Sequence, residues 1–312
     1  RCVFGARFTL KEHVGTVFGC ALSADGKLGI SSAHDKACIL WNMTSGTALR
    51  NLEGHSDIKF GRMFNVAFGC ALSADGKLAL SVSMDETCIL WDALDGAVIH
   101  KLHGHTDWVR GCALSADGKF ALSASRDTTC ILWNTSLGTK IHTLKGHTKV
   151  VHDCALSANG KLAISASGDH TCILWNTSCG KAIHTLEGHN DCVFGCALSS
   201  DGRLALSASR DSTCILWNVS HGTPIHTLIG HTGAVNGCEL SVDGTLALSA
   251  SDDNSCILWD TSSGAQIHKF KGHTDWVLEC ALSADGKQAL SASRDKTCIL
   301  WNTSGHAGQM IM

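Results

Sequence analysis

The sequence contains one proline in 312 residues and carries a formal net charge of only −3. So little proline leaves potential β-strands nearly free of residues that interrupt a hydrogen-bond ladder. The small net charge provides no overall field that favours nucleic acid. No apolar run approaches the ~18 residues that a membrane-spanning helix needs. We therefore expect neither a nucleic-acid partner nor a membrane-spanning segment.

Sequence signatures of cofactor and metal sites are missing as well. No CxxC pair, Gly-rich phosphate loop or paired carboxylates stand out, and metal sites built on cysteine usually use close CxxC-like spacing. We therefore expect no cofactor and no metal ion. Apolar residues make up 44% of the chain and charged residues 17%, which is typical of a globular protein with ample core.

One sequence segment of about forty residues recurs seven times. Its third copy begins at Gly104 and ends at Asn134, and the copies are marked by Trp41, Trp91, Trp133, Trp175, Trp217, Trp259 and Trp301. Neighbouring members of this set are 42 residues apart except for a first interval of 50. A fixed period of this length indicates a repeat architecture that uses the whole chain as one domain, 1–312.

The third copy predicts four short strands. Alternation of apolar and other residues predicts strands over 108–115 and 120–125, separated by an Asp-Gly turn. A continuous apolar run at 130–133 predicts a strand that is buried on both faces, and 140–144 predicts an outer strand. Four antiparallel strands per repeat are typical of a propeller blade.

The repeats resemble the WD40 repeat over almost the whole chain. The resemblance implies an all-β, seven-bladed propeller with four antiparallel strands per blade. It also implies a structural hydrogen-bond network in each blade, made by His13/Ser31/Asp35/Trp41, His55/Ser81/Asp85/Trp91, His105/Ser123/Asp127/Trp133, His147/Ser165/Asp169/Trp175, His189/Ser207/Asp211/Trp217, His231/Ser249/Asp253/Trp259 and His273/Ser291/Asp295/Trp301. Sevenfold repetition argues against catalytic Ser/His/Asp triads, because an enzyme needs a single site.

The two ends of the chain are complementary. After Trp301 the tail 303–312 offers no fourth strand, whereas 1–10 precedes the first repeat and contains one. We expect 1–10 to pair into the last blade and close the ring, which removes exposed sheet edges.

Most cysteines follow the repeat. Fourteen of the 17 lie in pairs on the expected first and third strands, about 9–10 Å apart in the sheet and beyond the ~7 Å Cα separation that a disulfide allows. Free thiols favour a reducing, cytoplasmic compartment. Five periodic histidines, His100, His142, His184, His226 and His268, are expected on solvated outer strands.

The resemblance places partner contacts on the narrow top face. The implied positions lie three and five residues after each blade His, or eight residues more in the longer second repeat, and just before each turn Asp. The candidates are Phe18, His34, Phe68, Met84, Trp108, Arg110, Arg126, His152, Phe194, Arg210, Asn236, Trp276, Leu278 and Arg294. Aromatic residues and Arg are enriched at interfaces. We expect Arg126, Arg210 and Arg294, together with Arg110, to ring the central funnel and bind carboxylates or phosphates. Alternatively, these arginines pair with acids such as Asp107, Asp211 or Asp275.

The second repeat carries eight extra residues within 56–65. Its apolar and basic side chains, Lys59, Phe60, Arg62 and Phe64, are expected to overhang the funnel, since long loops often carry function. A tolerated surface insertion is an equal alternative.

These features predict a monomeric, non-catalytic scaffold that recognises an acidic or phosphorylated protein segment. The resemblance implies roles in signalling, ubiquitin-ligase substrate capture, RNA processing or the sensor part of a larger regulatory protein. One alternative is a glycan- or small-molecule-binding propeller, in which Trp108 and Trp276 stack on sugar rings. A second alternative is an enzyme that uses His34, His152 and Cys192 in the funnel.

Overall fold

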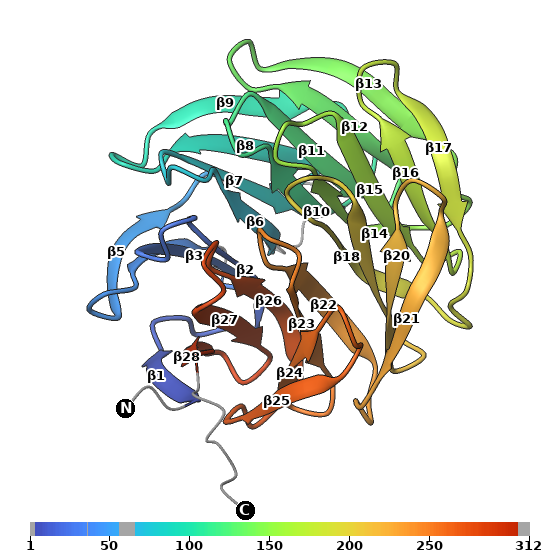
Figure 1. Ribbon diagram of the computed structural model, residues 1–312. Coiled ribbons are helices and arrows are strands. Elements are labelled where there is room, and N and C mark those ends of the chain that lie inside the picture. The colour runs from blue at the N-terminus through green and yellow to red at the C-terminus, as the bar shows by residue number, and fades with distance from the viewer. Residues whose placement is uncertain (1–3, 36, 56–65, 305–312) are drawn as a thin grey trace, which may run out of the picture.

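The chain forms seven four-stranded antiparallel sheets arranged around a central axis (Figure 1). This computed structural model describes residues 4–35, 37–55 and 66–304, and the predicted seven-bladed β-propeller is confirmed. In each sheet the strands are neighbours in chain order, except where the last sheet recruits the first strand. No helix in the described ranges is long and apolar enough to cross a membrane.

Strands occupy equivalent places in every blade. The innermost strands are β2 (Val17–Leu22), β6 (Ala67–Leu72), β10 (Val109–Leu114), β14 (Val151–Leu156), β18 (Val193–Leu198), β22 (Val235–Leu240) and β26 (Val277–Leu282). The second strands are β3 (Leu28–Ala33), β7 (Leu78–Ser83), β11 (Phe120–Ser125), β15 (Leu162–Ser167), β19 (Leu204–Ser209), β23 (Leu246–Ser251) and β27 (Gln288–Ser293). The third strands are β4 (Cys38–Asn42), β8 (Thr87–Asp92), β12 (Thr129–Asn134), β16 (Cys172–Asn176), β20 (Thr213–Asn218), β24 (Ser255–Asp260) and β28 (Cys298–Asn302). The outer strands are β5 (Thr47–Leu52), β9 (Val98–His103), β13 (Thr139–Lys145), β17 (Lys181–Leu186), β21 (Thr223–Ile229), β25 (Gln266–Lys271) and β1 (Gly5–Leu10).

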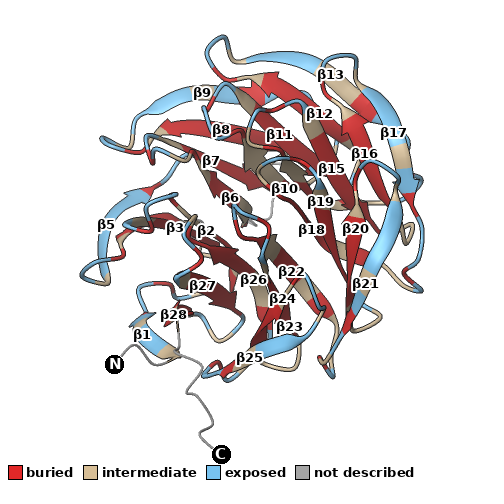
Figure 2. Ribbon diagram, in the orientation of Figure 1, coloured by how far each residue is buried: buried red, intermediate tan, exposed pale blue. Residues whose placement is uncertain are grey.

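The hydrophobic core lies between blades. The Cys-Ile-Leu-Trp run of each third strand is buried, whereas the outer strands are largely exposed (Figure 2). One cluster joins Trp217 of the fifth blade to Leu174 and Leu186 of the fourth. Because each cluster spans two neighbouring sheets, the blades stabilise one another around the ring.

The ring is closed by β1, as the sequence predicts. β1 pairs antiparallel with β28 from Gly5 opposite Asn302 to Leu10 opposite Cys298, and the two strands lie side by side in Figure 1. Leu10 is only 3% exposed and packs in one cluster with Cys298 and Leu300. β1 therefore completes both the hydrogen bonding and the core of the last blade.

Turns between first and second strands are fixed without proline. In the third blade the Ser115 hydroxyl donates to Asp117 at 2.8 Å and accepts the Phe120 N–H at 3.0 Å. Gly118 has a φ of +68° in this turn, a conformation that glycine adopts without steric cost. The side-chain hydrogen bonds therefore replace the conformational restriction that a proline would supply.

The cysteines within the described residues are all free thiols. The periodic pairs lie on first and third strands, as expected, and most of them are buried. Burial raises the pKa of Cys38 to about 12, so such thiols stay protonated and act as small apolar side chains.

The outer-strand histidines are half-buried rather than solvated, which corrects the expectation. The His100 ring N–H donates to the Ser136 carbonyl of the next blade at 3.3 Å. A Cβ at Gly138 would lie 2.7 Å from the same imidazole. His142, His184 and His226 repeat this contact on the following blades. At the end of the series, His268 stacks on Phe4 at a centroid distance of 4.4 Å. These histidines therefore link adjacent blades.

Candidate functional site

The seven His/Ser/Asp/Trp sets each form one hydrogen-bonded chain inside a blade. In the third blade, Trp133 Nε1–H donates to Ser123 at 2.9 Å, Ser123 lies 2.8 Å from His105 Nε2, and His105 Nδ1 lies 2.7 Å from Asp127. The same chain occurs in all the other blades. Since Asp127 only accepts, Nδ1 carries the proton and the Ser123 hydroxyl donates to Nε2.

The pKa values of the His and Asp side chains suit this chain of hydrogen bonds. Burial lowers the pKa of His147 and of His189, and outweighs the hydrogen bond each makes to its Asp. Burial alone would raise the pKa of Asp127, but the hydrogen bonds from His105 and Thr129 hold it at about 2. In the fourth and fifth blades, burial therefore favours a neutral imidazole between the hydroxyl and the carboxylate. The chain of hydrogen bonds satisfies polar groups that would otherwise be buried without partners.

The central channel opens on the top face, the end of the propeller where second and third strands are joined. The second residue of each innermost strand lines this cavity of about 440 Å³, as do the first-strand residues below it. The seven positions hold Phe18, Phe68, Arg110, His152, Phe194, Asn236 and Leu278. One set of predicted positions is therefore brought together around a single opening.

Aromatic and guanidinium groups form a continuous arc on one side of this mouth. Phe18 and Phe68 are 5.3 Å apart, and Phe68 is 6.0 Å from Trp108. Arg110 lies 5.1 Å above Phe68, and Arg126 lies 4.9 Å above Trp108. We call Phe18, Phe68, Trp108, Arg110 and Arg126 the aromatic–arginine arc. In the next two blades around the mouth, His152 and Phe194 are in edge contact at 5.1 Å.

Arg126, Arg210 and Arg294 do not ring the funnel, which corrects that expectation. These side chains lie outside the cavity lining, because the turn that carries them is one strand farther from the axis. Each is exposed and faces an Asp, at 3.7 Å in Arg126–Asp107, 3.9 Å in Arg210–Asp191 and 3.7 Å in Arg294–Asp275. The acid beside Arg210 is Asp191 rather than Asp211, since Asp211 is held by His189.

Arg110 differs from the other three arginines. It is half-buried at the channel mouth and makes no ion pair with any residue in the described part of the chain. Burial, followed by the charge of Arg126, lowers the pKa of this guanidinium. A buried cation without a carboxylate partner is costly. The arrangement therefore favours an anion at this position.

The remaining candidates play different parts. His34 is exposed and Met84 is half-buried, and neither lines the cavity. Asn236 is held by hydrogen bonds to Asp252 at 2.7 Å and to the Val277 carbonyl at 2.9 Å. The insertion residues Lys59, Phe60, Arg62 and Phe64 lie outside the described residues.

Three carboxyl groups in the channel wall were missed by the sequence analysis. Asp153 and Glu279 stand where five other first strands have Gly, and Glu239 stands where six have Ala. All three line the cavity. These departures from the repeat could have revealed them in the sequence. Asp153 accepts the Cys196 N–H at 3.1 Å, and Glu279 accepts the Cys280 N–H at 2.9 Å.

Burial shifts the titration of these groups. It raises the pKa of Glu239 to about 7, a shift opposed by the Leu240 N–H and increased by the charge of Asp153. Burial also raises the pKa of Asp153, and that of Glu279 further still because of the neighbouring carboxylates. These carboxyls therefore hold protons at pH values where exposed ones are ionised.

Replacing Glu239 by Ala is expected to stabilise the protein at alkaline pH. A native pKa near 7 exceeds the value of ~4.3 in an unfolded chain. Wild-type stability therefore falls as pH rises from about 4 through about 7. At pH 8 we expect the free energy of unfolding of E239A to exceed that of the wild type by about 1–2 kcal/mol. This is less than the full pKa shift implies, because solvent in the channel screens the charge.

Urea unfolding at pH 4 and pH 8 measures this effect. The difference between E239A and wild type should be small at pH 4. The exposed Glu187 serves as the matched control, and E187A should follow the wild type at both pH values. Equal stability of E239A and wild type at pH 8 would show that burial of the ionised Glu239 does not destabilise the protein.

Comparison with known proteins agrees with the geometry. The family profile "WD domain, G-beta repeat" matches seven segments, 6–42, 46–92, 96–134, 138–176, 180–218, 222–260 and 264–302. The chain belongs to the WD40 family. Its WD40 segments coincide with the repeat observed in the sequence, and WD40 propellers act generally as protein-interaction scaffolds.

Two curated WD40 relatives are similar over a short stretch. These are the proteins named "Dynein assembly factor with WD repeat domains 1" of Macaca fascicularis and of Homo sapiens, each 36% identical over 56 residues. The match covers 18% of this chain and 14% of each relative. It is therefore a likeness of repeat sequence over a small part of either protein.

Proposed function

We propose that this WD40 propeller recognises an acidic or phosphorylated segment of a partner protein at the mouth of its central channel. The observation that carries the proposal is the half-buried Arg110, which has no ion pair within the described residues and lies over Phe68 within the aromatic–arginine arc. A carboxylate or phosphate would supply the missing partner, and a guanidinium binds both with two parallel hydrogen bonds.

The arc supplies apolar contact around that anion. Phe18, Phe68 and Trp108 are each half-buried, so each retains surface for a partner. In the seventh blade, which adjoins the first, Trp276 is 43% exposed. A central charged contact surrounded by aromatic side chains is the arrangement in which interface energy is usually concentrated. The family's scaffold role and the word "assembly" in the relatives' name support a protein as the partner.

Neither alternative function gains support from the side-chain arrangement. Arg126 and Arg294 each cover one face of a tryptophan, Trp108 and Trp276 respectively, and so occupy a face on which a sugar ring would stack. Of His34, His152 and Cys192, only His152 lines the central cavity. Burial and the charge of Arg110 lower the pKa of His152 to about 4, so at neutral pH it bears no charge.

Substitution of Arg110 by Gln tests the proposal. The full chain would be applied to an array of synthetic peptides in which acidic, phosphoserine-containing and neutral sequences have matched apolar residues. We expect wild type to select acidic or phosphorylated peptides, and R110Q to bind them about 10- to 100-fold more weakly, since charged contacts at interface centres cost about 2 kcal/mol or more.

The matched control is R203Q. Arg203 is an exposed arginine in the turn between β18 and β19, at the opposite end of the propeller, and lies 3.5 Å from Asp201. R203Q should bind like wild type. Equal binding by R110Q and wild type, or selection of neutral peptides by wild type, would refute the proposed anion recognition.

A further inference from the structure

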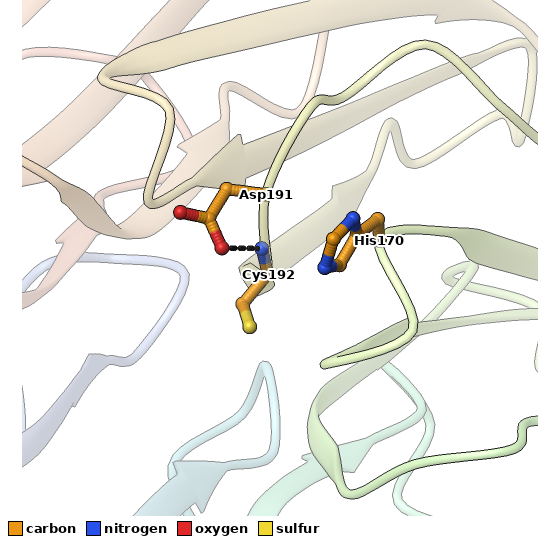
Figure 3. A group of neighbouring side chains, drawn as sticks. All are labelled: His170, Asp191 and Cys192. Carbon is orange, nitrogen blue, oxygen red and sulfur yellow. Dashed lines mark hydrogen bonds between the residues drawn. The ribbon is translucent and has the colours of Figure 1, made fainter.

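Three potential metal ligands converge at one seam between blades. His170 lies in the turn between β15 and β16 of the fourth blade, whereas Asp191 and Cys192 directly precede β18 of the fifth. One imidazole nitrogen, one carboxylate oxygen and the Cys192 sulfur all lie within 4.8 Å of one another. Figure 3 shows the imidazole and the thiol beside each other, with the carboxylate next to the Cys192 backbone.

Within the described part of the chain, only this seam combines three such residues. The turn position of His170 is occupied in the other blades by Lys36, Glu86, Thr128, Ser212, Asn254 and Lys296. The position of Cys192 is occupied by Thr16, Val66, Trp108, Val150, Ala234 and Trp276. Among the described residues, this is the one group of three His, Cys, Asp or Glu side chains close enough to share an ion.

The chemistry of the ligand set selects a class of ion. We propose that His170, Asp191 and Cys192 bind one divalent, borderline-soft cation of the zinc type at the top of the seam between the fourth and fifth blades. Imidazole, thiolate and carboxylate are the three protein ligands that zinc uses, and thiolate disfavours magnesium and calcium. Three protein ligands leave one tetrahedral position for water or for a side chain from outside.

The fold already holds the ligands near the required positions. His170 has a φ of +74°, a turn conformation that recurs in the other described blades and carries this side chain to the seam. The Cys192 N–H donates to Asp191 Oδ1 at 2.7 Å and orients the carboxylate, as a ligand's hydrogen-bonding partner commonly does. Ligand atoms around a tetrahedral zinc are about 3.5 Å apart, so side-chain rotations alone would complete the site.

Two existing contacts must break when the ion binds. Arg210 lies 3.9 Å from Asp191 Oδ2, a long and exposed contact that is weak. The Cys192 thiol lies 3.7 Å from the Gly168 carbonyl. Binding forms the metal–sulfur bond and breaks the S–H bond, and the proton passes to buffer. Affinity should therefore increase with pH.

No metal ion was expected from the sequence, because no CxxC spacing occurs. The ligands proposed here are instead 21 and 22 residues apart in the chain, and the packing of two blades brings them together. The ion would lie outside the central cavity. Loss of metal binding would therefore leave the recognition of an acidic segment at Arg110 untouched, and the reverse also holds.

Cobalt(II) provides a direct probe, because thiolate-bound tetrahedral cobalt absorbs light through charge transfer from sulfur. The full reduced chain would be titrated with Co²⁺ and then with Zn²⁺ as competitor. We expect a charge-transfer band that saturates at one equivalent and is displaced by Zn²⁺. C192V and H170N should lose at least about 100-fold in affinity, since removing a direct ligand exceeds the 10- to 100-fold cost of removing a ligand's supporting partner.

Matched controls separate this site from the other thiols. C179S removes an exposed cysteine from a turn at the opposite end of the propeller, and H221N removes an exposed histidine, and both should bind Co²⁺ like wild type. C192V copies the valine present at position 150 of the fourth blade, so it should fold, and its melting temperature without metal checks this. Zn²⁺ should raise the melting temperature of wild type but not of C192V. Absence of the band in wild type, or its persistence in C192V, would overturn the proposal.

Discussion

Deletion of residues 1–10 is expected to lower the melting temperature of the whole protein by about 10 °C or more. The deletion removes β1, leaves the β28 edge without its partner strand and exposes the cluster around Leu10. Loss of a buried leucine alone costs about 2–5 kcal/mol, and each kcal/mol corresponds to about 2–4 °C in a chain of this size. Differential scanning calorimetry of the two proteins measures the effect.

A point substitution provides the matched test of closure. Leu10 occupies in the last blade the place that Leu144 occupies in the third, since Leu10 pairs with Cys298 and Leu144 with Cys130. L10A and L144A should therefore destabilise the protein by similar amounts, about 2–4 kcal/mol each. A truncated protein with the wild-type melting temperature, or a harmless L10A beside a costly L144A, would show that the ring is not held by β1.

Substitution of Ser123 by Ala is expected to cost about 2–4 kcal/mol in the free energy of unfolding. Ser123 Oγ is the single contact that joins Trp133 Nε1–H to His105 Nε2. Its loss leaves two buried polar groups without that partner, each at a cost of about 1–3 kcal/mol. Urea unfolding monitored by tryptophan fluorescence measures the change.

The same substitution can be made where no network exists. The exposed Ser136 donates to Asn134 in a turn, and S136A should change stability by less than about 0.5 kcal/mol. S207A, which breaks the equivalent chain in the fifth blade, should match S123A. If S123A were as stable as S136A, the network would not be the structural element described here.

The fold could be predicted from the sequence because every repeat carries the same local information. Apolar alternation, Asp-Gly turns and the Cys-Ile-Leu-Trp run mark the same four strands seven times. The missing fourth strand after Trp301 pointed to β1, and the structure confirms that pairing. The interaction between distant termini was predictable because an open sheet edge has one complementary strand in the chain.

The candidate site was predicted less completely, because side-chain partners depend on how blades pack. Sequence position placed Arg110, Arg126, Arg210 and Arg294 on one face, but only the structure shows that Arg110 alone lines the channel. Asp191 and His170 became relevant through contacts across a seam. Glu239 was overlooked, although an Ala at six equivalent positions marked it as unusual.

The most direct test of the central claim is a crystal structure of the full chain with the tightest-binding acidic peptide from the array. The account predicts a carboxylate or phosphate of that peptide within hydrogen-bond distance of the Arg110 guanidinium, with neighbouring peptide side chains against Phe68 and Trp108. A peptide bound on the outer strands or at the opposite end of the propeller would contradict it.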